Sequence, residues 1–246
     1  MKKEKSGGFG ETLRTIAYAG LIAVLIRTVA YEPFNIPSAS MVPTLLVGDY
    51  LFVSKFSFGY SHHSLPFSLP LFQGRILERS PQRGDVAVFK LPRDNKTDYI
   101  KRIVGLPGDR MQVISGVLHI NGEPVKRQRL GDFVDYDRLG NGTRMTRYQE
   151  TLPNGKSYIV VEMTDAGPLD NTSVYVVPPG HYFGMGDNRD NSLDSRVLTQ
   201  VGYIPAENLV GRAEIIFFSS DGSAKLWEVW KWPSAIRFSR LFHVIE

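Results

Sequence analysis

Apolar residues are distributed along this chain in two contrasting ways. Near the N-terminus they form one long run, Leu13 to Tyr31, whose uninterrupted centre is 15–26. Past Tyr50 they occur in short runs separated by Gly, Pro, Asn and Asp. A long apolar run is typical of a helix in a bilayer, whereas short runs between turn residues are typical of β-strands. The pattern therefore predicts an N-terminal membrane segment followed by a β domain.

The short apolar runs predict most of the β domain. Helical periodicity is nearly absent beyond the N-terminal segment, which favours an antiparallel, turn-rich architecture. The pair Asn121-Gly122 is a strong hairpin turn signal. The predicted strands are 85–89, 99–104, 111–120, 157–163, 173–177, 181–185 and 212–218. The fold class expected is mainly β: a transmembrane helix, then an antiparallel β domain with an inserted β subdomain.

The insertion is predicted from a change in composition. The stretch 110–179 is polar in its middle, around 132–154, and it separates two regions that carry the candidate chemistry. We expect a short cytoplasmic N-terminus (1–11), an anchor (12–31), a β core (32–109 with 180–246) and the inserted subdomain (110–179).

The N-terminal apolar run has two interpretations. Lysines at 2, 3 and 5 and Arg14 precede its uninterrupted centre (15–26), which predicts a cytoplasmic N-terminus with the remainder exported. As a cleaved signal peptide, the run would end at the small-residue site Thr28-Val29-Ala30. As an anchor, it reaches the required ~20 residues only if Arg27 extends to the interface. Composition alone leaves the two interpretations even.

The remaining composition narrows the classes of function. The net charge is +4, with scattered Lys and Arg, so nucleic acid is not expected as a partner and an anionic lipid surface fits better. The chain has no cysteine, which excludes disulfides and thiol nucleophiles.

Two stretches could be either lipid-contacting or simply packed on the domain. The stretch 56–77 is rich in aromatic residues among Ser and Pro, and all three tryptophans fall between 227 and 232. Aromatic side chains favour membrane interfaces, but they also form small satellite cores. The sequence does not decide between these interpretations.

Ser40 is the leading candidate for a nucleophile. It lies between Pro37 and Pro43, just beyond the apolar run. A serine needs a base, yet no histidine lies in a triad context and neither Gly-x-Ser-x-Gly nor His-Glu-x-x-His occurs. Lys101, inside an apolar strand, could serve as a neutral amine if burial lowers its pKa. On spacing alone, an exposed strand lysine is the commoner case.

Four segments resemble the motifs of bacterial type I signal peptidases, a family of Ser–Lys serine peptidases. Residues 37–45 resemble the nucleophile box, and 83–89 resemble a second box. Residues 99–109 resemble the lysine box, and 186–196 resemble the last box. They occur in the family's order, whereas 111–179 contains no box. Because four motifs in order are specific, the chain is identified as a member of this family.

The resemblance implies a role for each matching residue. Ser40 would be the nucleophile and Lys101 the general base. Ser38 would stabilise the oxyanion together with the Ser40 amide, and Ser192 would orient the lysine. The implied ion pairs are Asp187–Arg102 and Asp194–Arg196.

It also implies a substrate and a location. A shallow pocket would accept small side chains at the −1 and −3 positions of a signal peptide, the Ala-x-Ala pattern. The residues implied to line it are Ile36, Pro37, Met41, Leu45, Tyr99 and Ile100. The protein would be a single-pass inner (plasma) membrane endopeptidase with its β domain on the outer (periplasmic) side. No metal or cofactor is implied; the partners would be signal peptides, membrane lipid and the translocation machinery.

Two departures and two rival functions accompany this interpretation. Ala39 occupies a position where the family often has Gly, which would add strain if φ were positive there. Leu193 occupies a position often filled by a small residue. The rivals are a self-cleaving Ser–Lys protease and a non-catalytic, membrane-tethered β domain that binds envelope proteins.

Overall fold

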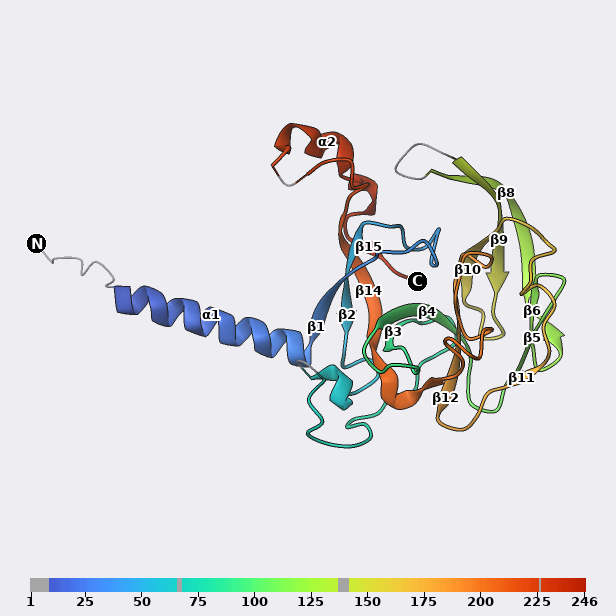
Figure 1. Cartoon of the computed structure of the whole chain (residues 1–246), viewed down its shortest axis with the longest axis horizontal. Helices are drawn as coiled ribbons and strands as arrows, with labels where there is room; N and C mark the ends of the chain where they lie inside the picture. The colour runs from blue at the N-terminus through green and yellow to red at the C-terminus, as the bar shows by residue number, and fades with distance from the viewer. Residues whose placement is uncertain (1–8, 66–67, 137–141, 226) are drawn as a thin grey trace, which may run out of the picture.

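The computed structural model describes residues 9–65, 68–136, 142–225 and 227–246. The N-terminal apolar run forms helix α1 (Phe9–Val29), which projects away from the β domain (Figure 1). Its 21 residues span about 31 Å, enough for a hydrocarbon core of about 30 Å. The segment Gly10–Val29 has a mean hydropathy of 1.4 and is not buried by the rest of the chain. The helix is therefore long and apolar enough to cross a membrane.

The last turn of α1 is connected directly to the β domain. The helix ends at Val29, so Tyr31, which we placed in the anchor, instead begins strand β1 (Tyr31–Asn35). Arg27 pairs with Glu32 of this strand at 2.6 Å. The Tyr60 hydroxyl donates to the Val29 carbonyl at 2.6 Å. These contacts fix the end of the helix against the domain.

One curled antiparallel sheet forms the main body of the domain. Its order is β1-β2-β14-β3-β4-β12-β13, and β15 pairs with β14. The bounds of the further strands are β2 (Asp49–Ser54), β3 (Val86–Lys90), β4 (Asp98–Gly105), β12 (His181–Met185), β13 (Ile204–Pro205), β14 (Leu209–Ser219) and β15 (His243–Val244). The expected fold class, mainly β with an N-terminal apolar helix, is confirmed.

Two smaller sheets are built from residues between β4 and β12. One has the order β11-β5-β6-β7 and the other β10-β9-β8. Their strands are β5 (Arg110–Ile114), β6 (Val117–Ile120), β7 (Glu123–Pro124), β8 (Lys126–Tyr136), β9 (Gly142–Thr151), β10 (Ser157–Glu162) and β11 (Tyr175–Val176). The predicted strand 111–120 is in fact a hairpin, because Ser115-Gly116 adopts positive φ and reverses the chain. Asn121-Gly122 makes the next turn, also with positive φ.

Strands β8 and β9 were not expected. They pair along most of their length, yet many of their side chains are exposed and charged, such as Arg129 and Arg144, which both contact Asp132. Because neither face of this ribbon is strongly apolar, its sequence lacks the alternation that marks a half-buried strand.

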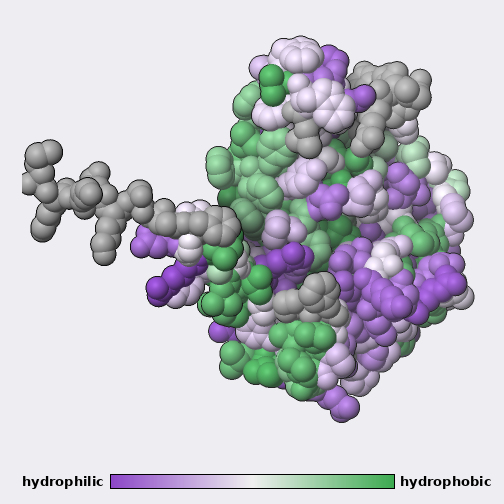
Figure 2. All heavy atoms as spheres, turned by 60° about the vertical axis from the view of Figure 1, so that its left-hand side comes forward, coloured by the Kyte–Doolittle hydropathy of each residue, from purple (hydrophilic) through white to green (hydrophobic). Residues whose placement is uncertain are grey.

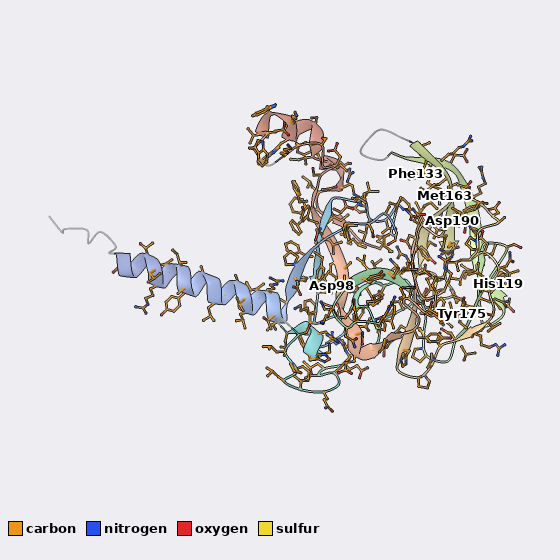
Figure 3. The ribbon with its side chains drawn as sticks, in the orientation of Figure 1. Asp98, His119, Phe133, Met163, Tyr175 and Asp190 are labelled. Carbon is orange, nitrogen blue, oxygen red and sulfur yellow. The ribbon has the colours of Figure 1, made fainter. Side chains whose placement is uncertain are left out.

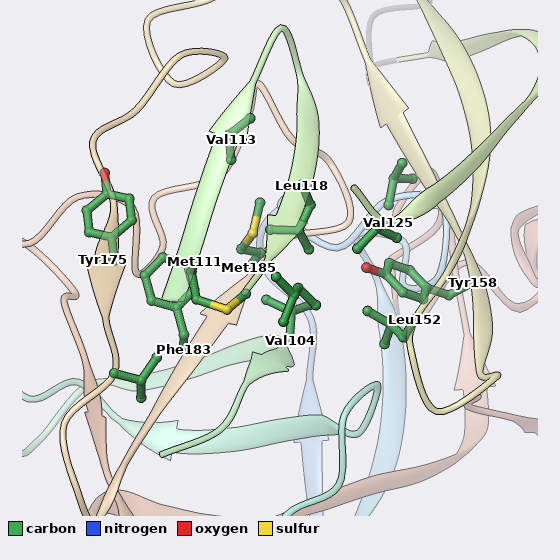
Figure 4. Packing of buried hydrophobic residues seen from close by; sticks show 13 residues of the cluster. Val104, Met111, Val113, Leu118, Val125, Leu152, Tyr158, Tyr175, Phe183 and Met185 are labelled. Atoms are coloured by element: carbon green, nitrogen blue, oxygen red, sulfur yellow. The ribbon is translucent and has the colours of Figure 1, made fainter. Parts of the chain in front are cut away.

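A shared core joins the small sheets to the main sheet. Val104 of β4 and Phe183 of β12 pack with Met111 and Leu118 of the β5–β6 hairpin (Figure 4). Two further apolar clusters lie against the main sheet, around Leu51 and around Phe89. The strands that carry the candidate site are therefore packed on both sides, which fixes their side chains.

Short helices complete the chain. Beyond β2 lies η1 (His62–Ser64), and η3 (Ala206–Asn208) precedes β14. Past β14 the chain forms an arm with η4 (Val229–Lys231) and α2 (Trp232–Ala235), then η5 (Phe238–Arg240). In this arm Trp227, Trp230 and Trp232 are exposed, so they do not form a satellite core.

Candidate active site

Ser40 lies in a loop that joins two paired strands, β1 and β2. The base of the loop is closed by backbone hydrogen bonds from Ile36 N to Asp49 O (2.8 Å) and from Gly48 N to Ile36 O (3.0 Å). Met41 and Leu45 anchor the loop, because both side chains are fully buried in the main-sheet core. Ser40 is 8% exposed and lines a cleft.

Lys101 approaches Ser40 from strand β4. Its Nζ lies 2.7 Å from Ser40 Oγ and donates a second hydrogen bond to the Ile100 carbonyl at 2.9 Å. The lysine is 3% exposed. Burial lowers its pKa from 10.5 to about 8, although the charges of Asp194 and Asp187 oppose this effect. About a tenth of the amine is therefore neutral at pH 7 and able to accept a proton.

Donors suited to an oxyanion lie beside Ser40. The Ser38 hydroxyl is 3.4 Å from Ser40 Oγ. Within the described residues, the Ser40 amide donates to no backbone carbonyl. Two such donors, one hydroxyl and one amide, can stabilise negative charge that develops on a carbonyl oxygen attacked by Ser40.

Arg102 and Asp187 form a bidentate pair behind the site. Nε and Nη2 of the arginine donate to the two carboxylate oxygens at 2.9 and 2.8 Å, and both side chains are buried. The Thr44 hydroxyl also donates to Asp187 at 2.5 Å. The alternation of β4 explains the arrangement, since Lys101 faces the serine and Arg102 faces away from it.

Asp194 and Arg196 form a second buried pair. The carboxylate accepts bonds from Nε and Nη2, both at 2.9 Å, and from the Gly186 amide at 3.0 Å. Burial alone would raise the pKa of Asp194, but Arg196 holds it below its ordinary value. Arg196 also donates to the Arg189 carbonyl at 2.6 Å, which ties the end of the 186–196 segment back to its interior.

Asn188 is a site residue that sequence reasoning missed. Its amide donates to the Ser40 carbonyl at 3.1 Å, and its side chain donates to the Ala39 carbonyl at 3.2 Å. The sequence feature that could have pointed to Asn188 is its position inside the 186–196 segment. Asn188 thus fixes the backbone on both sides of the Ser40 Cα.

The structure does not bring Ser192 into hydrogen bonding with Lys101. The partners of Nζ among the described residues are Ser40 Oγ and the Ile100 carbonyl, and the Ser192 hydroxyl is not one of them. Ser192 instead packs against Gly186. A Cβ on this glycine would lie 2.2 Å from Ser192 Oγ and 2.5 Å from the Ser40 carbonyl oxygen.

This contact predicts that Gly186→Ala will impair the site. The methyl group must displace the Ser40 backbone, and a misplacement of about 1 Å can cost about 100-fold in rate. We expect kcat/KM for a peptide substrate to fall at least about tenfold. Gly20→Ala is the matched control, because a Cβ there meets nothing within 4 Å. Equal rates for the two variants would show that Gly186 does not set the position of Ser40.

A cleft of about 530 Å³ leads to the serine and lysine. Four of the predicted pocket residues line it, namely Ile36, Pro37, Tyr99 and Ile100. Met41 and Leu45 do not, because their side chains point into the main-sheet core. The lining residues that we did not expect are Phe34, Asn35, Val88, Thr97, Asp98, Asn191 and Leu193.

The structure shows how the two residues that depart from the family pattern, Ala39 and Leu193, are accommodated. Ala39 is not among the non-glycine residues with positive φ in the described part of the chain, so the expected strain does not arise. Leu193 lines the cleft and is 43% exposed, so its larger side chain lies at the cleft surface and not in the core. No group of three His, Asp or Glu side chains suited to a metal ion occurs among the described residues.

A buried serine–lysine pair with oxyanion donors, beside a cleft of peptide dimensions, is the arrangement of a serine peptidase. Comparison with known proteins identifies which kind. The model of the family described as signal peptidase, peptidase S26, matches residues 9–218. The chain belongs to this family, and the resemblance found in its motifs is confirmed.

Two relatives match nearly the whole chain, and a solved structure matches about half of it. Signal peptidase I of Rickettsia typhi is 40% identical over 90% of this chain and 88% of its own length. Signal peptidase I of Rickettsia conorii is 39% identical over 93% of this chain and 90% of its own length. A crystal structure of a signal peptidase I from Enterococcus faecalis is 26% identical and covers 55% of this chain and 97% of that one, with a TM-score of 0.32.

Proposed function

We propose that this protein is a membrane-anchored serine endopeptidase that removes signal peptides from exported preproteins, with Ser40 as nucleophile and Lys101 as general base. The observation that carries the proposal is the buried 2.7 Å contact between Lys101 Nζ and Ser40 Oγ. A pKa of about 8 makes this lysine a base that works at neutral pH.

The chemistry is an acyl transfer in two halves. Neutral Lys101 takes the Ser40 proton as Oγ attacks the carbonyl carbon of the scissile bond, and the oxygen that becomes negative is bound by Ser38 Oγ and the Ser40 amide. The C–N bond then breaks as the lysine returns the proton to the departing amine. In the second half, Lys101 takes a proton from water, hydroxide attacks the acyl-enzyme, and the same proton restores the Ser40 hydroxyl.

Free strand edges support binding of an extended peptide in the cleft. Strand β4 pairs with β12 only from Arg102 onward, so residues 98–101 have one unpaired edge. Strand β1 pairs with β2 alone among the described strands. Both segments line the cleft, and a peptide can add between them as a further strand. Alternate side chains, at −1 and −3, would then share one face and enter the apolar pocket.

The membrane helix and an aromatic surface support docking at a bilayer. Tyr31, Phe52, Phe56 and Phe217 contact one another through their rings on β1, β2 and β14 and the turn after β2. Apolar side chains gather on the body beside the point where α1 leaves it (Figure 2). Such side chains favour the interface.

We place the β domain on the outer side of the inner membrane and the N-terminus in the cytoplasm, with the exposed tryptophans of the arm in contact with lipid. Protease added to spheroplasts should digest the β domain and spare a tag at the N-terminus. The reverse pattern would contradict the orientation.

The function is tested with purified protein in detergent micelles and a preprotein that carries a signal peptide. We expect one cut, after the small −1 residue, identified by mass spectrometry of the new N-terminus. A preprotein with Trp at −1 is the control and should remain intact, because the pocket is shallow. Cleavage only of the enzyme itself would favour the self-cleaving alternative, and no cleavage would favour the binding domain.

A further inference from the structure

A second, smaller cavity continues the substrate cleft toward the membrane helix. Its volume is about 180 Å³. Phe34 and Asp98 line both spaces, so the cavity begins where the cleft ends. Arg27 and Thr28, in the last turn of α1, form its far wall. Asp98, labelled in Figure 3, lies near the end of that helix in the view.

The cavity is charged, whereas the cleft beside it is largely apolar. Lys55 is buried and pairs with Glu32 at 2.9 Å, and Arg27 pairs with the same carboxylate at 2.6 Å. Lys90 pairs with Asp98 at 2.8 Å. Each carboxylate thus has a cationic partner, and the three cations exceed the two carboxylates by one. His63 adds no charge at neutral pH, because burial lowers its pKa to about 4.

The geometry of a bound strand determines which substrate residue reaches this cavity. Glu32, Phe34 and Ile36 lie on the inward face of β1 and its continuation, two residues apart. A peptide extended along this track places its −1, −3 and −5 side chains on the same face, about 7 Å apart. With −1 at Ser40 and −3 in the apolar pocket, −5 falls beyond Phe34, at the charged cavity. The −4 side chain points the other way.

The direction of the peptide follows from the membrane. The apolar segment of a signal peptide lies in the bilayer, as α1 does, and the cleavage site follows that segment. The signal side of the bound strand therefore runs from Ser40 toward the end of α1, which is the direction of the cavity.

We propose that this cavity is a third subsite, which receives the −5 side chain of the signal peptide and favours an acidic or hydroxyl side chain over a basic one. The proposal rests on the proposed function, because it assumes that a signal peptide is cut at Ser40. Arg27, whose side chain is 65% exposed, is the cation most available to the ligand. Lysine at −5 would meet the excess positive charge.

The test uses synthetic signal peptides that differ only at −5 or −4, with Asp, Ser or Lys at the chosen position. For −5 we expect kcat/KM to be about three- to fivefold higher with Asp than with Lys, the range of a partly exposed ion pair. At −4 the ratio should be close to one. This second series controls for long-range attraction, which is the same for both positions.

Variants of the enzyme test the residues themselves. Arg27→Gln and Lys90→Gln should each lower the Asp/Lys ratio of kcat/KM at −5 to about one or below, because each removes one cation from the cavity. Lys90→Gln also leaves Asp98 unpaired. Lys96→Gln is the matched control, because it removes the same charge from the neighbouring loop without lining the cavity. It should keep the wild-type ratio.

The outcomes separate this proposal from the proposed function. If no peptide is cut after its −1 residue, the function itself fails. If the peptides are cut but the −5 and −4 series give equal ratios, the third subsite is refuted while the function stands. A preference that persists in Arg27→Gln and Lys90→Gln would likewise refute the assignment of the cavity.

Discussion

Replacing Lys101 by methionine is expected to abolish signal peptide cleavage while the protein remains folded. Methionine has similar length and no proton-accepting amine, so Ser40 would keep its position but lose its base. We expect kcat/KM to fall by about 10⁴-fold or more, as when one member of a catalytic unit is removed. Ser40→Ala should give a loss of the same size, and the double variant should add little, because the two residues act as a unit.

The control separates chemistry from folding. Lys96→Met makes the same change at an exposed lysine outside the cleft and should retain wild-type activity. Thermal unfolding in micelles should show that the Lys101 variant is at least as stable as the wild type, because a buried amine is replaced by an apolar group. Residual turnover above about 1% in either Lys101→Met or Ser40→Ala would rule out the pair as nucleophile and base.

Local pattern was enough to predict the elements that carry the candidate chemistry. The apolar run around Lys101 predicted a strand, which is β4, and the alternation of side chains in a strand accounts for Lys101 and Arg102 facing opposite ways. The N-terminal run predicted a helix long enough to span a membrane. These are properties of neighbouring residues, so they can be read without knowing the fold.

Features that depend on distant parts of the chain could not be predicted in this way. Met41 and Leu45 are apolar, but only the packed sheet shows that they anchor the loop rather than line the cleft. The second hydrogen bond of Lys101 goes to the carbonyl of the adjacent Ile100 and not to Ser192, and a sequence motif gives no information on where a backbone carbonyl points. Strands β8 and β9 are held by pairing with each other and not by burial of an apolar face, so their sequence carries no alternating apolar pattern.

The charged cavity likewise depends on residues from distant parts of the chain. Its cations come from α1, from the residue that directly follows β2 and from β3, which are far apart in sequence. Each of these residues alone reads as an ordinary surface charge. Only the fold brings Arg27, Lys55 and Lys90 around one space that continues the cleft. Neither the cavity nor its excess positive charge could therefore be predicted from the sequence.

The rate of cleavage is expected to rise with pH up to about pH 8 and then level off. The active form of Lys101 is the neutral amine, and burial lowers its pKa to about 8 from 10.5. Below the pKa the neutral fraction falls tenfold per pH unit, so kcat/KM at pH 6 should be about 1% of its plateau value. Because Lys101 acts as a base, its protonation removes the active form, so acid lowers the rate.

The measurement is kcat/KM for a peptide without titratable side chains, from pH 5.5 to 9.5, with circular dichroism at each pH to confirm that the fold persists. An apparent pKa near 8 would support a desolvated lysine as the base. A rate that still rises tenfold per unit above pH 9 would mean that Lys101 keeps its ordinary pKa and is solvated in the working enzyme. A flat profile would mean that no lysine titrates in the rate-limiting step, and Ser40 would then need a different base.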